Sequence, residues 1–370
     1  MADKPQFCNS MAKLAFTPLL MQWHFNNNHR QMPWKGETNP YKVWLSEIIL
    51  QQTRVEQGWA YFERFISRYP TITALAAAND DEVFKLWEGL GYYNRCKNLL
   101  FTARLVTDKY KGVFPSDYET ILSLKGVGAY TAAAIASFCF NLAYPVIDGN
   151  VLRVLARIFA IETPIDSKQA KPLFTQLAEK LLYKQNPGAF NQAIMDFGAT
   201  VCKPALPLCS TCPLQKICKA YQTGMVHILP LKEKNLQRKT RWLTYFIFES
   251  GGSMLVHKRT AKDIWQNLFE FYLIETAADP KWDTALIKEW LSNQLGTTAG
   301  DGFEIYAAEK QQLTHQEIKG YFIKLSFSTI PPALKLQHFL WLQKPAVEQL
   351  PFPRFINQFT GQHSHQSQLF

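Results

Sequence analysis

Long apolar runs are missing from this chain of 370 residues. No uninterrupted stretch approaches the roughly 20 residues that a membrane-spanning helix needs, and the polar segment Met1–Ser10 lacks the hydrophobic core of a signal peptide. Both absences argue against a membrane or secreted protein. We therefore expect a cytoplasmic location, where thiols stay reduced.

Acidic residues are outnumbered, because 30 Asp and Glu stand against 40 Lys and Arg and leave a net charge of +10. A basic chain is compatible with a polyanionic partner, but many basic proteins bind no nucleic acid. The hydrophobic share of 47% and the charged share of 19% are those of a globular protein. The length exceeds one ordinary domain, and no internal repeat is visible, so we expect two domains.

Cysteine is sparse except in one short segment. Four of the seven cysteines follow the spacing C-x6-C-x2-C-x5-C, namely Cys202, Cys209, Cys212 and Cys218. Structural zinc usually takes two short-spaced pairs, whereas one short pair flanked by single cysteines suits a [4Fe–4S] cluster. The spacing favours the cluster, with zinc and disulfides as the alternatives.

Helical periodicity dominates the first part of the chain and disappears from the second. Residues 1–225 are predicted to be all-helical, with helices at 40–52, 55–69, 82–88, 95–110, 117–122, 130–140, 151–160, 168–183 and 187–201. Residues 226–240 are polar and basic and are predicted to form a linker. Residues 241–355 are predicted to be α+β, with a hairpin at Gly251-Gly252. Residues 356–370 are expected to form a flexible tail.

One glycine-rich segment lies between two predicted helices and reads L-K-G-V-G-A-Y-T-A over residues 124–132. Gly126 and Gly128 permit backbone conformations that a Cβ would forbid. The first free N–H groups of the following helix would point out of this loop and could hold a phosphate. A tight turn between packed helices is the alternative.

This hairpin and three further motifs resemble the endonuclease III superfamily of DNA base-excision glycosylases. The hairpin (118–138) is similar to the helix-hairpin-helix of that family, V-I-D-G-N-V (146–151) to its catalytic-aspartate segment, and the cysteine loop (202–218) to its cluster motif. W-L-S-E-I-I-L-Q-Q-T (44–53) and G-L-G-Y-Y (89–93) resemble the MutY-type adenine DNA glycosylase branch. The resemblance implies a mainly helical fold with a [4Fe–4S] cluster. It also implies a double-stranded DNA partner in which adenine is mispaired with 8-oxoguanine or guanine.

The resemblance implies that two carboxyl groups have separate roles in catalysis. Glu47 lies in an apolar run, where burial would raise its pKa and keep it protonated, and the resemblance makes it the acid that protonates adenine. Asp148 precedes a helix whose N–H groups would stabilise its charged form, and the implied role is to stabilise the oxocarbenium ion. Tyr130 and Asn150 match residues that the family places beside these carboxyls. A satisfied buried glutamate and a simple helix cap are the alternatives.

Position 130 separates two reactions. Lyase-type relatives carry a lysine there, and its amine forms a Schiff base with the sugar. A phenol cannot form an imine, so Tyr130 predicts hydrolysis without efficient strand cleavage, that is, a monofunctional glycosylase. An endonuclease III-like glycosylase/lyase and a catalytically inactive, cluster-bearing DNA-binding protein are the alternatives.

The resemblance also implies a set of residues that contact DNA. They are Arg30, Trp34, Gln52, Thr53, Arg54, Tyr92, Lys125, Gly126 and Gly128. Residues 241–355 resemble a Nudix-like domain, in which Thr314 and His315 are implied to recognise 8-oxoguanine, while Leu313 replaces a phenylalanine of the family. No G-x5-E-x7-R-E box is present, so pyrophosphatase activity is not expected. We expect a bacterial, nucleoid-associated monomer.

Overall fold

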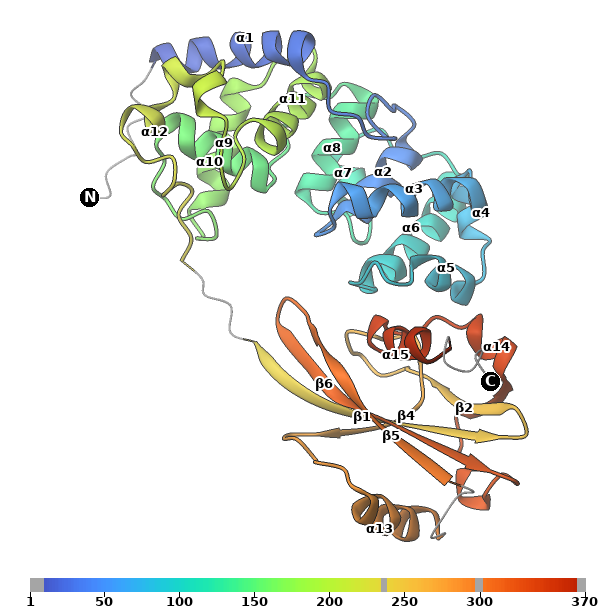
Figure 1. Cartoon of the computed structure of the whole chain (residues 1–370). Helices are drawn as coiled ribbons and strands as arrows, with labels where there is room; N and C mark the ends of the chain where they lie inside the picture. Colours follow the sequence, from blue (N-terminus) through green and yellow to red (C-terminus); the bar gives the residue numbers. More distant parts are fainter. Residues whose placement is uncertain (1–9, 234–237, 297–301, 365–370) are drawn as a thin grey trace. The chain divides into compact units, whose positions relative to one another are not determined.

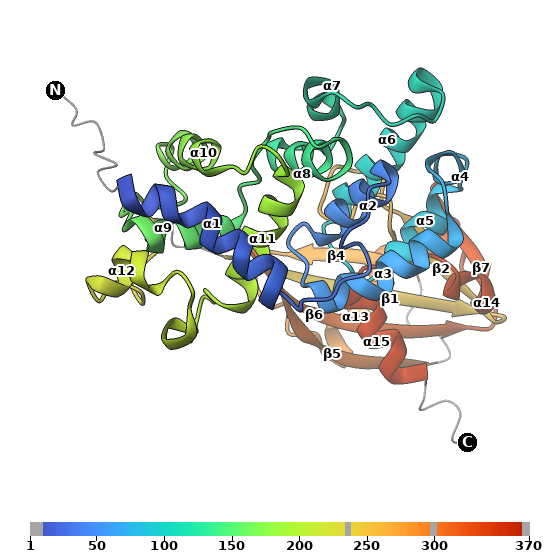
Figure 2. The same ribbon diagram turned by 90° about the horizontal axis from the view of Figure 1, so that it is seen from above.

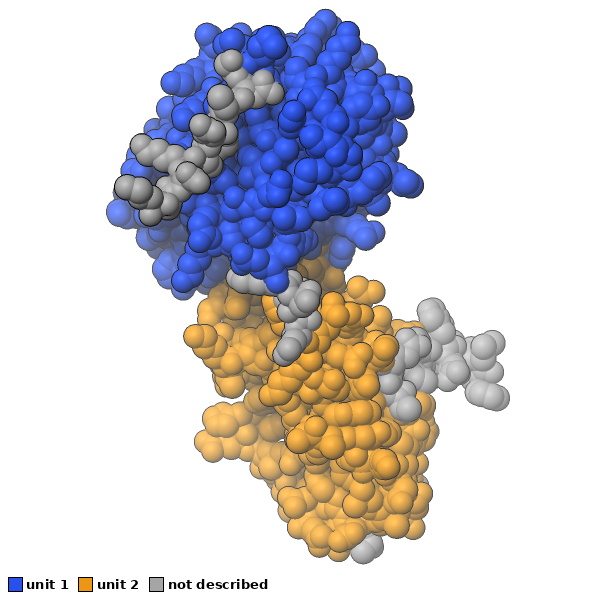
Figure 3. All heavy atoms as spheres, turned by 90° about the vertical axis from the view of Figure 1, so that its left-hand side faces the viewer, with its two compact units in different colours: residues 1–77, 98–234 blue, residues 78–97, 235–370 orange. Residues whose placement is uncertain are grey.

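The computed structural model describes residues 10–233, 238–296 and 302–364. The chain divides into two compact units (Figure 3), a helical unit of residues 1–77 and 98–234 and a mixed unit of residues 78–97 and 235–370. The mixed unit is therefore not contiguous in sequence, unlike the predicted domain at 241–355. Segment 78–97 belongs to it because Lys258 pairs with Asp81 and the Phe352 N–H donates to Glu88 (2.8 Å).

The helical unit is built from short helices joined by short links (Figure 1). Its helices are α1 (Ser10–Asn27), α2 (Pro40–Leu50), α3 (Val55–Arg68), α4 (Ile72–Ala76), most of α6 (Asn94–Tyr110), α7 (Tyr118–Ser123), α8 (Ala129–Phe140), α9 (Gly149–Phe159), α10 (Ala170–Leu181), α11 (Pro187–Thr200) and α12 (Lys219–Gln222). The predicted helices match these within a few residues, except that the helix predicted at 82–88 is α5 (Asp80–Trp87) and belongs to the mixed unit. Helices α1, α4 and α12 were not predicted. Helix α1 carries Pro18 in its interior, which ordinarily argues against a helix.

Local sequence explains where several of these helices begin. Side-chain oxygens of Asn39, Asp117, Asp148 and Asn186 accept backbone N–H groups in the first turns of α2, α7, α9 and α11. Such caps satisfy N–H groups that have no partner within the helix. Proline follows the cap in α2 and α11, where its missing N–H costs nothing.

Helices α1, α8, α9, α10 and α11 share one hydrophobic core. Helix α1 packs along α11 (Figures 1 and 2), and the rings of Trp23 and Phe197 meet edge to face at 5.0 Å. Val226 and Leu229 are buried in the same core. The predicted linker is therefore wrong at its start, because these apolar side chains return to the helical unit. Residues 234–237 of that linker lie outside the described residues.

The mixed unit contains a seven-stranded sheet with the order β3-β2-β1-β6-β5, and β4 and β7 pair with β1 and β2. The strands are β1 (Lys239–Ser250), β2 (Ser253–Lys258), β3 (Phe269–Glu270), β4 (Tyr272–Thr276), β5 (Gly302–Gln312), β6 (Gln316–Phe327) and β7 (Phe339–Gln343). Strands β1 and β6 are parallel, and the other pairs are antiparallel. The unit also holds α5 (Asp80–Trp87), α13 (Thr284–Leu295), α14 (Lys344–Glu348) and α15 (Arg354–Ser364). The prediction of an α+β second domain is confirmed.

Strand β1 is buried on both faces, as a central strand should be. Phe246 and Phe248 share a core with residues of α13, while Tyr245 contacts Phe355 of α15. The flexible tail predicted from residue 356 is wrong over 356–364, because Phe359 of α15 stacks on Phe322 at 4.0 Å. Residues 365–370 lie outside the described residues. Within the described chain, no helix combines the length and apolarity that crossing a bilayer requires.

Candidate active site

A cavity of about 620 Å³ opens in the helical unit, and residues of α2, α8, α9 and α11 form its walls. Seven of the predicted site residues line it together: Arg30, Trp34, Glu47, Thr53, Tyr130, Asp148 and Asn150. They come from five separate parts of the sequence. The fold therefore places both predicted carboxyl groups on one recess.

Glu47 lies on the inner face of α2, and only 6% of its surface is exposed. Its Oε2 has no hydrogen-bond partner among the described residues. Burial raises the pKa of Glu47 to about 7, and the charge of Asp148 acts in the same direction, whereas the nearby Tyr130 hydroxyl lowers it. Near neutral pH this carboxyl can therefore hold a proton and give it up, as a general acid must.

Asp148 is the N-cap of α9 and has two hydrogen-bond donors. Its Oδ1 accepts the Val151 N–H (2.7 Å), and its Oδ2 accepts the Asn150 amide (2.7 Å). We predicted that helix N–H groups would favour the anion, and they do lower its pKa, but burial outweighs them and leaves the pKa of Asp148 above its ordinary value. The two carboxyls still differ, because Asp148 has donors in place and Glu47 Oε2 has none.

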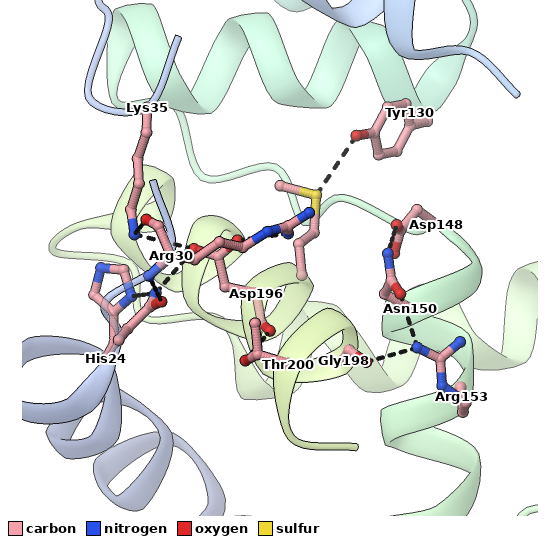
Figure 4. Close-up of polar contacts among 12 residues, drawn as sticks. His24, Arg30, Lys35, Tyr130, Asp148, Asn150, Arg153, Asp196, Gly198 and Thr200 are labelled. Carbon is pink, nitrogen blue, oxygen red and sulfur yellow. Dashed lines mark hydrogen bonds and ion pairs between the residues drawn. The ribbon is translucent and has the colours of Figure 1, made fainter. Parts of the chain in front are cut away.

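Arg153 fixes the amide that faces Asp148. Its Nη2 donates to Asn150 Oδ1 (2.8 Å) and to the carbonyl of Gly198 (2.8 Å), and its Nε donates to the carbonyl of Cys202 (2.8 Å). With its oxygen held by Arg153, the Asn150 amide turns its NH₂ group towards Asp148 (Figure 4). Sequence reasoning missed Arg153, although two arginines inside the apolar run of α9, Arg153 and Arg157, were a possible signal.

Tyr130 lies in the first turn of α8 and lines the same cavity as the two carboxyls. Its hydroxyl donates to Met195 Sδ of α11 at 3.5 Å (Figure 4). Burial and the charge of Glu47 raise the pKa of Tyr130 well above its usual range, so the phenol stays protonated. Met195 and Gln192 also line the cavity and were not predicted.

Lys125, Gly126 and Gly128 in the turn of the hairpin lie outside this cavity. Gly126 adopts a positive φ of 83°, and a Cβ there would come within 2.8 Å of Asn98 Cβ, so the turn requires glycine. The Lys125 ammonium lies over the ring of Phe101 at 4.3 Å. Gly128, Gln52 and Arg54 are exposed, the last two in the turn after α2. They do not line the cavity.

Tyr92 and Thr314 meet within the mixed unit. Tyr92 has a positive φ of 49°, and 42% of its surface is exposed. Its hydroxyl hydrogen-bonds with the Thr314 hydroxyl in the turn between β5 and β6. His315 is exposed in the same turn, and its carbonyl accepts the Lys239 N–H (3.2 Å). Tyr92, which is implied to contact DNA, is thus a neighbour of the residues implied to recognise 8-oxoguanine.

Comparisons with known proteins bear on this site. Residues 45–180 match the family described as HhH-GPD superfamily base excision DNA repair protein. An adenine DNA glycosylase of Buchnera aphidicola (subspecies Acyrthosiphon pisum) is 38% identical over 263 residues, which are 70% of this chain and 75% of the relative. A second one, from the subspecies Schizaphis graminum, is 34% identical over 323 residues, which are 86% of each chain. The chain belongs to the adenine DNA glycosylase family.

One solved structure is similar to the helical part of this glycosylase. It is titled as a thermostable thymine-DNA glycosylase, shares 28% identity and a TM-score of 0.53, and covers 57% of this chain and 97% of its own. The predicted family and the helical part of the predicted fold are confirmed. Because the second Buchnera alignment spans 86% of this chain, the similarity also reaches into the mixed unit.

The four clustered cysteines of this glycosylase are not joined by disulfides and line one small cavity beside α9 and α11. Burial raises the pKa of Cys212 to about 12, and the neighbouring thiols add to the rise. Arg157 Nη1 lies 3.5 Å from Cys202 Sγ and also donates to the Lys203 carbonyl (2.7 Å). Four soft sulfur donors around one recess fit a thiolate-bound metal group, and the family generally carries a [4Fe–4S] cluster.

Proposed function

We propose that this chain hydrolyses the N-glycosidic bond of adenine mispaired with 8-oxoguanine or guanine in duplex DNA. The observation that carries the proposal is the cavity of about 620 Å³ on which Glu47 and Asp148 converge in different hydrogen-bonding environments. Two carboxyl groups of unequal proton affinity are what cleavage of a sugar bond requires. An adenine enters this cavity only after leaving the base stack.

Glu47 acts first in this proposal, as the acid. It delivers its proton to a ring nitrogen of adenine while the C–N bond breaks and the bonding electrons leave with the base. The sugar is left with oxocarbenium character, and the Asp148 carboxylate stabilises that charge. Water then adds to the sugar carbon and loses a proton, which gives an abasic site. Asn150 and Arg153 hold Asp148 in place through the contacts described above.

The phenol of Tyr130 supports hydrolysis over lyase chemistry. The cavity lining contains one lysine among the described residues, Lys35, whose Nζ lies 3.3 Å from a carboxylate oxygen of Asp196. Lys125 lies outside the lining, over Phe101. We expect borohydride to trap no substantial covalent complex with DNA. Strong trapping at Lys125 would contradict a monofunctional enzyme.

The mixed unit would read the base opposite adenine. Tyr92 is exposed and can stack between bases, and Thr314 and His315 can hydrogen-bond with 8-oxoguanine. The contact between the hydroxyls of Tyr92 and Thr314 supports a joint action of these residues.

The cysteine loop would hold a [4Fe–4S] cluster through Cys202, Cys209, Cys212 and Cys218. These four cysteines would bind the cluster as thiolates, which would fix the loop that carries Lys203 and Lys216. Iron and acid-labile sulfide in about a four-to-four ratio per chain would support this proposal, and stoichiometric zinc in place of iron would contradict it.

The direct test is excision under single-turnover conditions from a duplex with one adenine opposite 8-oxoguanine. Matched duplexes carry adenine opposite guanine or opposite thymine. We expect adenine release from the first two and none from the third. Binding of the mispaired duplex without adenine release would contradict the proposal and would indicate a DNA-binding protein without glycosylase activity.

A further inference from the structure

A buried carboxylate lies behind the wall of the active-site cavity. Asp196 is fully buried, with 0% of its surface exposed, and it is the only charged residue of α11. Burial of an isolated carboxylate is unfavourable, so its partners decide what it does. Neither the catalytic scheme nor the sequence motifs assign it a role.

Three donors from the irregular segment between α1 and α2 surround Asp196. Arg30 Nη1 donates to Oδ1 at 2.9 Å, the Asn28 amide donates to Oδ2 at 2.8 Å, and Lys35 Nζ lies 3.3 Å from Oδ2. Lys35 also donates to the carbonyl of Arg30 at 2.7 Å. Figure 4 shows Arg30 and Lys35 converging on Asp196. Segment 28–39 is therefore tied to α11 mainly through one carboxylate.

The groups tied to Asp196 belong to the cavity. Arg30 and Lys35 line it together with Glu47 and Asp148. The Arg30 side chain is 23% exposed, and among the described residues only its Nη1 has a side-chain acceptor. Its remaining guanidinium N–H groups stay available to a molecule in the cavity, at a place that Asp196 determines.

The negative charge of Asp196 also lowers the net positive charge beside the cavity. Arg30 and Lys35 alone would place two positive charges on a cavity in which the proposed reaction develops positive charge. Like charges in a site of low dielectric oppose that development strongly. The Asp196 carboxylate cancels one of the two.

We infer that Asp196 is a positioning residue, which holds the Arg30 guanidinium against the cavity so that it donates to a ring nitrogen of the extruded adenine. This inference rests on the proposed function. It explains why a helix that is otherwise uncharged carries one acid at the position facing segment 28–39.

The test is a double-mutant cycle in the full-length chain. Asp196→Asn, Arg30→Gln and the double variant are compared with wild type by single-turnover excision at saturating enzyme, and duplex affinity is measured separately. Asp108→Asn makes the same chemical change at an exposed position of α6 and serves as the matched control. Asp196→Glu keeps the charge but moves the carboxylate by one methylene. Thermal unfolding reports whether each variant is folded.

We expect Asp196→Asn and Arg30→Gln each to slow excision by about tenfold or more, because a small misplacement of a positioning group has effects of this size. The double variant should be no slower than the slower single variant, since both changes remove one interaction. Asp196→Glu should be slowed less, and Asp108→Asn should match wild type. Should Asp196→Asn fail to fold, Asp196→Glu combined with Arg30→Gln completes the same cycle.

Multiplicative losses in the double variant, or full activity of folded Asp196→Asn, would overturn the inference. A merely structural role would lower the melting temperature but leave the losses independent of Arg30. The proposed function fails in a different way, namely by absence of adenine release from the wild-type chain.

Discussion

At the scale of single residues, the proposed chemistry depends on two carboxyls that line one cavity but differ in their hydrogen-bond partners. Glu47 has an Oε2 without a partner among the described residues, whereas both oxygens of Asp148 accept a hydrogen bond. Such a difference allows one carboxyl to act as an acid and the other as an anion at the same pH.

The raised pKa of Glu47 should make the free energy of unfolding depend on pH. Because its pKa rises from 4.5 to about 7 on folding, the folded chain binds this proton more tightly than the unfolded chain. The contribution is fully present below pH 4.5 and is lost as pH rises through 7. We expect Glu47→Gln to raise the free energy of unfolding at pH 8 by on the order of 3 kcal/mol and to change it little at pH 4.5. Urea unfolding at both pH values measures this, and an equal gain at both would contradict it.

Tyr130 should also affect the pKa of Glu47. The Tyr130 hydroxyl lowers the pKa of Glu47, so Tyr130→Phe should raise that pKa. The pH above which single-turnover excision declines should then move upwards, whatever happens to the maximal rate. A shift to lower pH would mean that the phenol does not stabilise the Glu47 carboxylate.

The sequence predicted the residues of the cavity better than the residues behind it. Glu47, Asp148, Tyr130 and Asn150 came from motifs, and the fold brings all four to one recess. Arg153 and Asp196 were missed because a charged residue in a helix is solvent-exposed by default. Their burial depends on which helices pack together, and no local pattern contains that information.

At the scale of elements, capping residues and periodicity predicted most helices, since both are local properties. Helix α1 was missed, and its interior Pro18 offers a local reason. Residues 356–364 were predicted to be flexible, yet the burial of Ile356 and the contact of Phe359 with Phe322 place them in α15. Tertiary packing prevailed over the polar composition of that segment.

The close approach of α9 and α11 gives a test at this scale. A Cβ on Gly198 would lie 2.7 Å from Asn150 Cβ and 3.1 Å from the Asn150 carbonyl oxygen. In an isolated helix Gly→Ala stabilises by roughly 1 kcal/mol, but here we expect Gly198→Ala to destabilise by about 1–3 kcal/mol. It should also slow excision, because Asn150 holds Asp148. Thermal unfolding and single-turnover rates measure the two effects.

Gly361→Ala in α15 is the matched control, since a Cβ there meets nothing within 4 Å. It should be neutral or mildly stabilising and leave the rate unchanged. A stabilised and fully active Gly198→Ala would show that α9 and α11 can separate without consequence.

At the scale of the whole molecule, the two units are interleaved in sequence. Segment 78–97 interrupts the helical unit and packs with residues beyond 235. Composition predicted two domains but placed this segment in the first, because its own pattern is helical like that of its neighbours. Only long-range contacts such as Lys258 with Asp81 assign it to the mixed unit.

Removing the residues beyond 234 should loosen segment 78–97. A chain ending at residue 234 loses the partners of α5, including Lys258 and the Phe352 N–H that Glu88 accepts. We expect limited trypsin digestion to cut at Lys85, Arg95 or Lys97 much faster than in the full chain, because local opening governs cleavage. Cleavage sites are read by mass spectrometry, and equal protection of 78–97 in both chains would contradict the division.

The most direct measurement of the central claim is the pH dependence of single-turnover adenine excision by wild type, Glu47→Gln and Asp148→Asn. The account predicts that the wild-type rate falls about tenfold per pH unit above roughly 7, as Glu47 loses its proton. Both variants should lose nearly all activity while still binding the duplex. A wild-type rate that is flat from pH 6 to 9, or a Glu47→Gln variant that excises adenine at the wild-type rate, would contradict it.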